Sequence, residues 1–548
     1  MTNFTNSTAA ETEFLQGLPI PPPGQIRELL RLHLPPLAPL SSTLSAITNE
    51  LARYDAEIAE LKTRLEQLAI ERAAFQARYS DYTGLLAPIR RLPSELLVDI
   101  FGLCGDSSPT ITDFNGVFAP LHTELARLAH APILTLSQVC ARWHGIALGT
   151  PALWARIDLE GALWTAPHRF EDIISLLRSV LERSADHSLS VTVTSEGGTS
   201  IHAPALDLLV HHSHRWREAQ FICPFSDLAH LSRLENKLPR LRHLELFCWG
   251  DDGVLGFNIF KNAPRLKRVD FSGNTEIIGS ASILPLEQLT ELRCVECIVD
   301  VAPAILGLIN RLSQSATLYL QLSGQELEDG VDFTVDGPPV TSHLAVLVLE
   351  LCDFVPTFAG RTLEKVLAYM ILPSVTEIMF VNVGDDPLPP LPWPHSAFIS
   401  LSQRSSFHAH LHRLDLQKVV LLEGELLESL AGLSALKDLS IADHPSLSLS
   451  GSVEHVLITD TLLAALTRPT DSLGLVPELE MLECSSILCF DDSVLLDCVT
   501  SRLDGTRRFT CQLGWLPGHA RDINAAVYAR IGELSAQSNL AFSFLPAP

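Results

Sequence analysis

Apolar residues recur at alternating spacings of three and four along an early stretch of the chain. Placed at the first and fourth positions of a seven-residue repeat, they form a stripe of Leu44, Ile47, Leu51, Tyr54, Ile58, Leu61, Leu65, Leu68, Arg72, Phe75, Tyr79 and Tyr82. Only Arg72 in this stripe is charged. A mean spacing of 3.5 residues is typical of a supercoiled helix. We therefore predict a coiled-coil helix over residues 41–84.

This stripe needs a partner, because a narrow apolar line on a long helix has no core of its own. A parallel homodimer through residues 44–82 is one interpretation. The alternatives are that the stripe packs onto the protein's own body or pairs with a different chain. Gly84 and Pro88 follow the stripe and predict the end of the helix.

A second pattern, short apolar segments of the form L-x-x-L-x-L, recurs further along the chain. The segments begin at Leu241, Leu266, Leu289, Leu344, Val375, Leu411, Leu436 and Leu479, and Ser188–Thr194 and Glu218–Cys223 are irregular versions of them. Alternation of apolar and polar residues predicts strands. Helices are expected between the strands at Pro303–Leu312, Leu363–Met370, Glu425–Leu430 and Thr461–Thr467.

The spacing of these segments is regular in places. The fourth position advances by 25 residues from Leu244 to Val269 and by 23 residues from Val269 to Leu292. Such periods resemble leucine-rich repeats, in which one strand and one helix stack per turn. The resemblance implies an α/β solenoid with a curved parallel sheet over residues 186–548. A non-repeat α/β domain would contain similar strands and is the alternative.

A solenoid of this kind presents a concave sheet that suits protein binding. Polar residues beside the strand leucines are expected to point outward there: Arg242, His243, Glu245, Lys267, Arg268, Asp270, Glu291, Arg293, His412, Arg413 and Asp415. The predicted target-binding residues are Arg242, Glu245, Lys267, Asp270, Arg293 and Arg413. A solvated sheet surface is the alternative interpretation for each of them.

Two motifs stand in order between these regions. The first is Leu92-Pro93-Ser94-Glu95-Leu96-Leu97-Val98-Asp99-Ile100-Phe101, and the second is Leu136-Ser137-Gln138-Val139-Cys140-Ala141-Arg142-Trp143-His144-Gly145-Ile146-Ala147. Together they resemble an F-box, the helical adaptor-binding module of cullin–RING ubiquitin ligases, here at residues 88–156. The segment Thr150-Pro151-Ala152-Leu153-Trp154 is similar to that of many fungal F-box proteins. The resemblance implies adaptor contacts by Leu92, Pro93, Glu95, Leu96, Ile100, Val139, Cys140 and Trp143.

The positions of proline and of the apolar residues predict a pair of short helices in this segment. Pro93 can open the first helix, because the first turn does not use the missing N–H. Apolar residues from Leu96 to Phe101 are predicted to share one face of it, and Leu136 to Trp143 the matching face of a second helix. The motifs are separated by an insert, Gly102–Thr135, with a helix predicted at Thr123–His130. This insert either bulges outward or shields the partner surface.

Composition and charge limit the partners and the cellular locations that we expect for this protein. The chain of 548 residues is 47% hydrophobic, enough for large cores, and 64 acidic against 39 basic residues give a net charge of −25. This charge disfavours nucleic acid and anionic membranes as partners. We see no membrane-length apolar run and no secretory signal, and the 11 cysteines fit reduced core residues. We expect an intracellular protein of the cytoplasm, the nucleus or both.

The first 40 residues are polar and then rich in proline. Proline removes backbone donors and disfavours helix in the residue before it. We predict a disordered arm over residues 1–40, interrupted by a helical patch near Ile26–Leu34.

No pattern indicates a catalytic site, a metal site or a cofactor. Cys294-Val-Glu-Cys297 lacks the second ligand pair that a zinc site needs, so packing is the preferred interpretation. Two histidine groups also lack a thiol or carboxylate partner: His211, His212 and His214, and His408, His410 and His412. Alternation places the second group on one face of a predicted strand, so weak metal binding there is the alternative interpretation. Phosphate-loop, hydrolase and metalloprotease motifs are absent from the sequence.

The F-box resemblance implies a substrate-recognition subunit of an SCF-type ubiquitin ligase that is not itself an enzyme. The F-box would bind the adaptor, and the repeat domain would bind an unidentified target protein and bring it near the ubiquitin-carrying enzyme. The alternative is a coiled-coil and leucine-rich-repeat scaffold for protein–protein interaction without ligase function.

Overall fold

The computed structural model describes most of the chain. The described residues are 23–32, 40–105, 132–160, 170–195, 203–228, 231, 234, 237–249, 259–273, 284–298, 302–323, 338–352, 356–383, 391–444, 456–469, 474–487, 489–503, 508–516 and 521–544. The chain divides into two units, Met1–Leu97 and Val98–Pro548. We describe each unit by itself.

Within the predicted N-terminal arm, the structure describes a short helix. Helix α2 spans Pro23–Leu32, at the place where the sequence predicts a helical patch. The rest of the arm before residue 40 lies outside the described residues.

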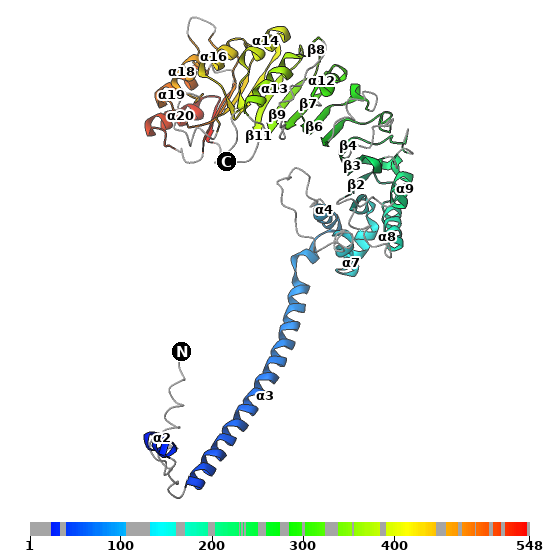
Figure 1. Ribbon diagram of the computed structural model, residues 1–548, viewed down its shortest axis with the longest axis vertical. Coiled ribbons are helices and arrows are strands. Elements are labelled where there is room, and N and C mark those ends of the chain that lie inside the picture. The colour runs from blue at the N-terminus through cyan, green and yellow to red at the C-terminus, as the bar shows by residue number, and fades with distance from the viewer. Residues whose placement is uncertain are drawn as a thin grey trace. The chain divides into compact units, whose positions relative to one another are not determined.

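One long helix dominates the first unit (Figure 1). Helix α3 spans Leu40–Leu86, and its 47 residues extend over roughly 70 Å at 1.5 Å per residue. The prediction that Gly84 ends this helix is wrong. One glycine in a helix costs only about 1 kcal/mol, whereas Pro88 cannot continue the helix and opens the 3-10 turn η1, Pro88–Arg91. The Gly84 carbonyl accepts a hydrogen bond from Nε of Arg90 at 2.8 Å.

The apolar stripe of α3 is uncovered in the single chain. Exposed side chains of the stripe include Leu44, Leu51, Tyr54, Ile58, Leu61, Leu65, Leu68, Phe75, Tyr79 and Tyr82. The helix therefore forms as predicted, while its heptad positions lack the partner that such a repeat needs.

A helical region follows, and its second motif forms two short helices where one was predicted. Helix α4 spans Ser94–Gly105, α6 spans Pro132–Ser137, α7 spans Ala141–Gly149 and the 3-10 turn η2 spans Pro151–Trp154. The prediction of one helix from Leu136 to Trp143 is wrong, because the chain turns between α6 and α7. The Ser137 hydroxyl donates to the Leu134 carbonyl, and Cys140 is extended with φ −161°. The helix predicted at Thr123–His130 lies outside the described residues.

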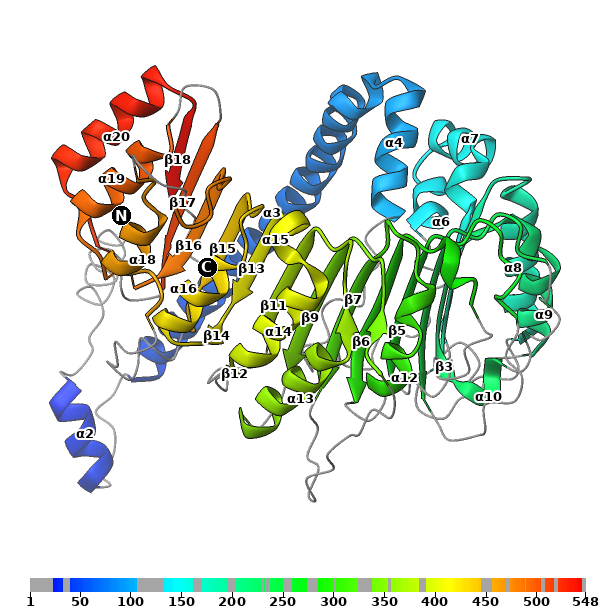
Figure 2. The same cartoon turned by 90° about the horizontal axis from the view of Figure 1, so that it is seen from above.

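The described residues of the second unit form a parallel sheet of 14 strands in chain order (Figures 1 and 2). The strands are β1 Arg156–Glu160, β2 Leu189–Thr194, β3 Trp216–Pro224, β4 His243–Trp249, β5 Arg268–Gly273, β6 Glu291–Ile298, β7 Thr317–Ser323, β9 Val346–Cys352, β11 Glu377–Val383, β13 Arg413–Gln417, β15 Asp438–Ala442, β16 Met481–Ser486, β17 Phe509–Trp515 and β18 Leu540–Phe544. Two further strand pairs are β8 Val340–Thr341 with β10 Met370–Ile371, and β12 Leu391–Pro392 with β14 Val419–Val420. The predicted α/β architecture with a large parallel sheet is confirmed.

The register of the sheet follows the repeated leucine position. Leu244 pairs with Val269, which pairs with Leu292. The same row continues through Leu318, Leu347, Ile378, Leu414, Leu439 and Leu482. All of these side chains are buried. The sheet extends beyond the predicted segments, since β1 starts before residue 186 and β17 and β18 follow the last one.

Helices cover the outer, convex side of the sheet, as α13, α14 and α16 show in Figure 2. The helices and 3-10 turns are α8 Phe170–Arg183, α9 Ala203–His211, η5 Ser213–Arg215, α10 Phe225–Leu228, η7 Leu286–Gln288, α12 Ala302–Leu306, η9 Ile309–Arg311, α13 Pro356–Ala368, α14 His395–Ser405, α15 Phe407–His410, α16 Glu423–Ala431, α18 Asp460–Leu466, α19 Asp492–Ser501 and α20 Ala525–Gln537. One continuous apolar core lies between helices and sheet. The opposite, concave side of the strands is called the open face below.

Two further local predictions in this unit are wrong. The helix expected at Pro303–Leu312 is split into α12 and η9 around Gly307, which weakens a helix interior. The histidines at 408, 410 and 412 do not share a strand face, because His408 and His410 lie in helix α15. This helix starts after Ser406, which has a left-handed φ of 59°.

Candidate binding surfaces

Helix α4 carries two apolar stripes rather than the single face predicted. Leu97 and Phe101, four residues apart, are buried. Leu96, Ile100 and Leu103 follow the same spacing but lie about 100° around the helix and stay accessible. One stripe is thus buried, and the other stays accessible.

The turn between α6 and α7 exposes a second apolar position. Val139 lies in this turn and is 57% exposed. Cys140 precedes α7 as its N-cap residue and is partly exposed. Trp143, on the first turn of α7, packs its ring 4.9 Å from the ring of Phe101. Its position gives Trp143 a core contact as well as an accessible edge.

The end of the helical region is fixed by a buried tryptophan. Trp154 in η2 donates its indole N–H to the Ala147 carbonyl at 2.7 Å. The guanidinium carbon of Arg183, at the end of α8, lies 4.5 Å from the centre of the Trp154 ring. This hydrogen bond and cation–π contact tie α7 to the first helix that covers the sheet.

The structure leaves the predicted adaptor-binding residues available. All of Leu92, Pro93, Glu95, Leu96, Ile100, Val139, Cys140 and Trp143 are exposed or partly exposed. The nearby buried residues are Leu97, Phe101, Ala147 and Trp154. The sequence missed Leu103, which continues the accessible stripe of α4 and is found by counting i, i+4 and i+7 from Leu96.

On the open face, charged residues at the β4–β5 end neutralise one another. His243 Nε2 lies 3.0 Å from Oδ2 of Asp270, and Arg268 donates to both carboxylate oxygens at 3.2 and 3.0 Å. Arg268 also lies 3.7 Å from Glu291. Burial acts to raise the pKa of Asp270, but the hydrogen bonds from His243 and Arg268 outweigh it and hold that pKa below its usual value. Glu245 beside them has its pKa raised by burial.

His243, Glu245 and Asp270 also place their ligand atoms within 4.8 Å of one another, as a metal site requires. The guanidinium of Arg268 already binds Asp270 and repels a divalent cation. Internal ion pairing therefore accounts for this cluster. Neither histidine group singled out from the sequence brings three ligand atoms together in the described residues. Cys294 is buried in β6, consistent with packing.

The middle of the open face is built around Tyr319 on β7. The guanidinium of Arg293 lies 4.3 Å from the centre of the Tyr319 ring. Burial raises the pKa of Tyr319, and its hydrogen bond to Glu350 adds to that rise. Glu350 also accepts a hydrogen bond from the Gln321 amide at 3.1 Å. Beyond it, β9 and β11 present Val346, Val348, Met379 and Val381, which we call the apolar strip.

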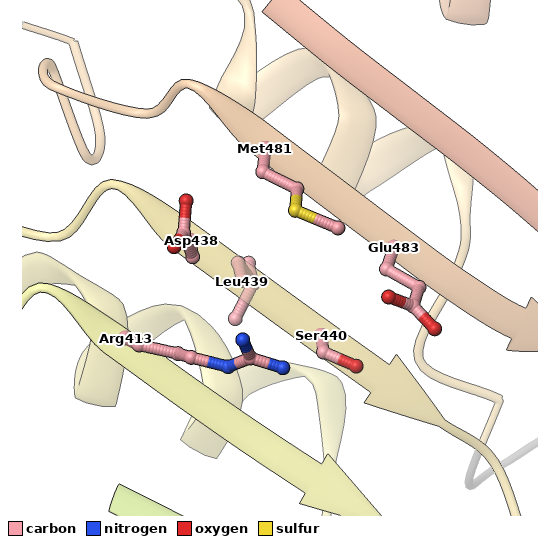
Figure 3. A pocket seen from close by; sticks show the side chains of 6 residues that line it. All are labelled: Arg413, Asp438, Leu439, Ser440, Met481 and Glu483. Carbon is pink, nitrogen blue, oxygen red and sulfur yellow. The ribbon is translucent and has the colours of Figure 1, made fainter. Parts of the chain in front are cut away.

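A shallow depression marks the β13–β16 part of the open face (Figure 3). It is lined by Arg413, Asp438, Leu439, Ser440, Met481 and Glu483. It has no enclosed room for even a water molecule, so it is not a small-molecule pocket. Arg413 lies 3.7 Å from Asp415, whose pKa is raised by burial. The depression is therefore part of the accessible sheet surface rather than a pocket.

The predicted target-binding residues are spread along this face and its edge. Glu245, Asp270, Arg293 and Arg413 lie on strands β4, β5, β6 and β13. Arg242 and Lys267 each precede a strand, and the Arg242 carbonyl accepts from the Lys267 amide at 2.8 Å. The sequence reasoning missed Glu350, Glu377, Asp438 and Glu483, which the same period-two alternation would have identified.

Comparison with protein families identifies the helical region. Residues 89–160 match the family model described as F-box-like. The chain therefore contains an F-box-like domain, which runs from η1 through β1 and confirms the resemblance carried by the two motifs. Its fungal type remains a prediction. A comparison with curated proteins finds no match. Among the helices that the structure describes, none combines the length and apolarity needed to cross a membrane.

Proposed function

We propose that this chain is the substrate-recognition subunit of an SCF-type ubiquitin ligase and catalyses no reaction itself. The observation that carries the proposal is the F-box-like match over residues 89–160. In this proposal the F-box-like domain binds the cullin-ligase adaptor, and the open face of a leucine-rich-repeat-like domain binds a target protein. Holding both at once raises the concentration of the target near the ubiquitin-carrying enzyme.

The accessible apolar side chains of the F-box-like domain support the adaptor contact. Leu96, Ile100 and Val139 are exposed or partly exposed, whereas Leu97 and Phe101 are each buried. Each large aliphatic side chain gains about 1.5–3 kcal/mol when a partner removes it fully from water. A partner helix that covers these positions would bind through such a contact.

The adaptor contact is tested with the purified full chain and a purified cullin-ligase adaptor in a binding assay. Leu96→Glu places a charge in the proposed contact and is expected to weaken binding at least tenfold. Leu422→Glu is the matched control, because Leu96 and Leu422 are both 49% exposed and only Leu96 lies in the F-box-like domain. Failure of the native chain to bind, or an equal loss in both variants, would reject the proposal in favour of a scaffold without ligase function.

We further propose that α3 pairs in parallel with α3 of a second copy. Its exposed heptad stripe is the supporting observation. In a parallel pair Glu57 of one helix and Lys62 of the other occupy facing flanking positions and carry opposite charges. Sedimentation velocity of the full chain over a micromolar concentration series tests this pairing, and a single monomeric species at every concentration would reject it.

A further inference from the structure

The open face carries an excess of carboxylates. The in-register positions from β3 to β17 that alternate with buried residues include nine carboxylates, Glu218, Glu245, Asp270, Glu291, Glu350, Glu377, Asp415, Asp438 and Glu483, and three guanidinium groups, Arg268, Arg293 and Arg413. A concave surface lined mainly by one sign of charge concentrates its field and attracts the opposite charge.

The three guanidinium groups are already engaged. Arg268 pairs with Asp270 and Glu291, Arg413 lies 3.7 Å from Asp415, and Arg293 stacks on Tyr319. Among the residues that the structure describes, no ion pair involves Glu377, Asp438 or Glu483, a group that we call the acidic end. The acidic end thus has three carboxylates and one neighbouring cation, Arg413, which lies in register between Glu377 and Asp438, so it keeps an excess of negative charge.

The apolar strip lies next to this charge. Glu350 and Glu377 belong to the same strands, β9 and β11, as Val346, Val348, Met379 and Val381. The side chains of Val346, Met379 and Val381 are partly exposed. An apolar centre with a charged rim is the usual arrangement of a protein-binding surface.

Resting on the proposed function, we propose that the target segment bound by this face is basic and contains an apolar residue. The apolar residue contacts the apolar strip, and Lys or Arg side chains on its flanks pair with Glu350 and with the acidic end. Neighbouring strands are about 4.8 Å apart, so Asp438 on β15 lies about 10 Å across the sheet from Glu377 on β11. An extended segment covers that distance in about three residues.

The shallow surface between β13 and β16 offers one of the basic side chains a contact with carboxylates. Asp438 and Glu483 line it, and Figure 3 shows both carboxylates beside Met481 at its edge. A Lys or Arg stem can lie along the Met481 side chain while its charged end reaches a carboxylate. The guanidinium of Arg413 keeps its contact with Asp415 and limits this site to one added cation.

The test measures binding of a fluorescent nine-residue peptide to the full chain by fluorescence anisotropy. The peptide has a central leucine between serines and two lysines or arginines on each flank. One matched peptide replaces every basic residue by glutamate, and another replaces the leucine by serine. We expect binding of the first peptide, weaker binding of the serine version and no binding of the acidic version.

Two triple variants separate a local site from general attraction to an acidic protein. The test variant carries Glu377→Lys, Asp438→Lys and Glu483→Lys. The control variant carries Glu182→Lys, Glu364→Lys and Asp497→Lys on the outer helices, where these residues are exposed. Both variants change the net charge equally. We expect at least a tenfold loss of peptide affinity in the test variant and less than a threefold change in the control.

Equal losses in the two variants, no peptide binding by the native chain, or equal binding of the acidic peptide would overturn the inference. Circular dichroism of each variant confirms that it is folded. Adaptor binding is measured on the same preparations. Adaptor binding without peptide binding would reject the basic segment and leave the proposed ligase function standing, whereas peptide binding without adaptor binding would reject the ligase function alone.

Discussion

The long helix α3 and the parallel sheet use leucine repeats in opposite ways. In the sheet, each strand places its repeated apolar residue against the equivalent residue of the next strand, so Leu347 is 0% exposed. In α3 the apolar residue at a heptad position has no neighbour of this kind, and Leu61 is 63% exposed. The repeated apolar residues of the sheet are thus buried within one chain, whereas those of α3 are exposed.

This difference shows how the period of a repeat determines where its partner comes from. A period of 23 or 25 residues leaves room for a strand and a returning segment, so the next copy of the motif stacks on the last one. A period of seven residues continues along one straight helix and never returns to cover its own stripe. The stripe of α3 therefore stays exposed in the single chain, while the repeated leucines of the sheet are buried by folding alone.

The largest effect is expected from placing a charge in each repeat. Leu347→Asp buries a carboxylate without a partner, and its cost is comparable to the whole stability of a domain, so the second unit should not fold. Leu61→Asp should leave that unit folded and instead abolish self-association. Tryptophan fluorescence reports the difference, because all seven tryptophans lie in the second unit. A fluorescence change in Leu61→Asp like that of Leu347→Asp would contradict the comparison.

A buried carboxyl group makes the stability of the sheet depend on pH. Asp443, which follows β15, accepts hydrogen bonds from the Ser486 hydroxyl and from the Leu457 amide at 3.4 Å. Burial raises its pKa to about 7. The unfolded chain ionises this group near pH 4 and the folded chain near pH 7. Its contribution to stability is therefore complete below about pH 4 and is lost as pH rises to about 7, a change of about 4 kcal/mol.

Asp443→Asn removes this titration and keeps the size of the side chain. The difference in the free energy of unfolding, variant minus native, should increase by about 4 kcal/mol between pH 4 and pH 7.5. Urea unfolding at each pH measures both free energies. Asp497→Asn is the control for the loss of one carboxylate, because Asp497 is exposed on α19. A curve for Asp443→Asn that is parallel to the native one would show that Asp443 is ionised in the folded chain.

The strands and the long helix could be predicted from the sequence because their signals are periodic. The row from Leu244 to Leu482 was visible as a repeated motif, and so was the heptad stripe. Strand β1 could not be found in this way, since its five residues alternate too briefly to stand out. The break before α7 was missed because Leu136 and Trp143 keep helical spacing across a turn that local hydrogen bonds impose.

The sequence predicted where the candidate surfaces lie, but it identified only some of the residues that are accessible on them. The two F-box-like motifs located the helical domain, but the sequence could not separate Leu97, which is buried, from Leu96, which is accessible. On the sheet, alternation indicated which residues leave the core. It did not indicate that His243 on β4 would lie 3.0 Å from Asp270 on β5, while Glu377 and Asp438 form no ion pair among the described residues, because such contacts depend on neighbours from other strands.

A smaller effect is expected from the one charge in the heptad stripe. Arg72 occupies a core position of the proposed dimer, where a charged residue lowers stability while fixing the register. Arg72→Leu should tighten self-association about tenfold, or about 1.4 kcal/mol, measured by sedimentation equilibrium of the full chain. Arg53 lies off the stripe, so Arg53→Leu should not change the affinity of self-association. Weaker association of Arg72→Leu would mean that Arg72 contacts an acidic partner instead.

The smallest effect concerns the end of α3. Gly84 lies inside the helix, and no atom lies within 4 Å of the position that a Cβ would take. Gly84→Ala should therefore stabilise the last turns by about 1 kcal/mol, because alanine loses less backbone freedom than glycine in a helix. Hydrogen exchange of the amides from Tyr82 to Leu86 should slow about fivefold, and exchange in the sheet should not change. Unchanged exchange at these amides would show that the helix stops at Gly84, as the sequence predicts. In that case α3 would not extend to Leu86.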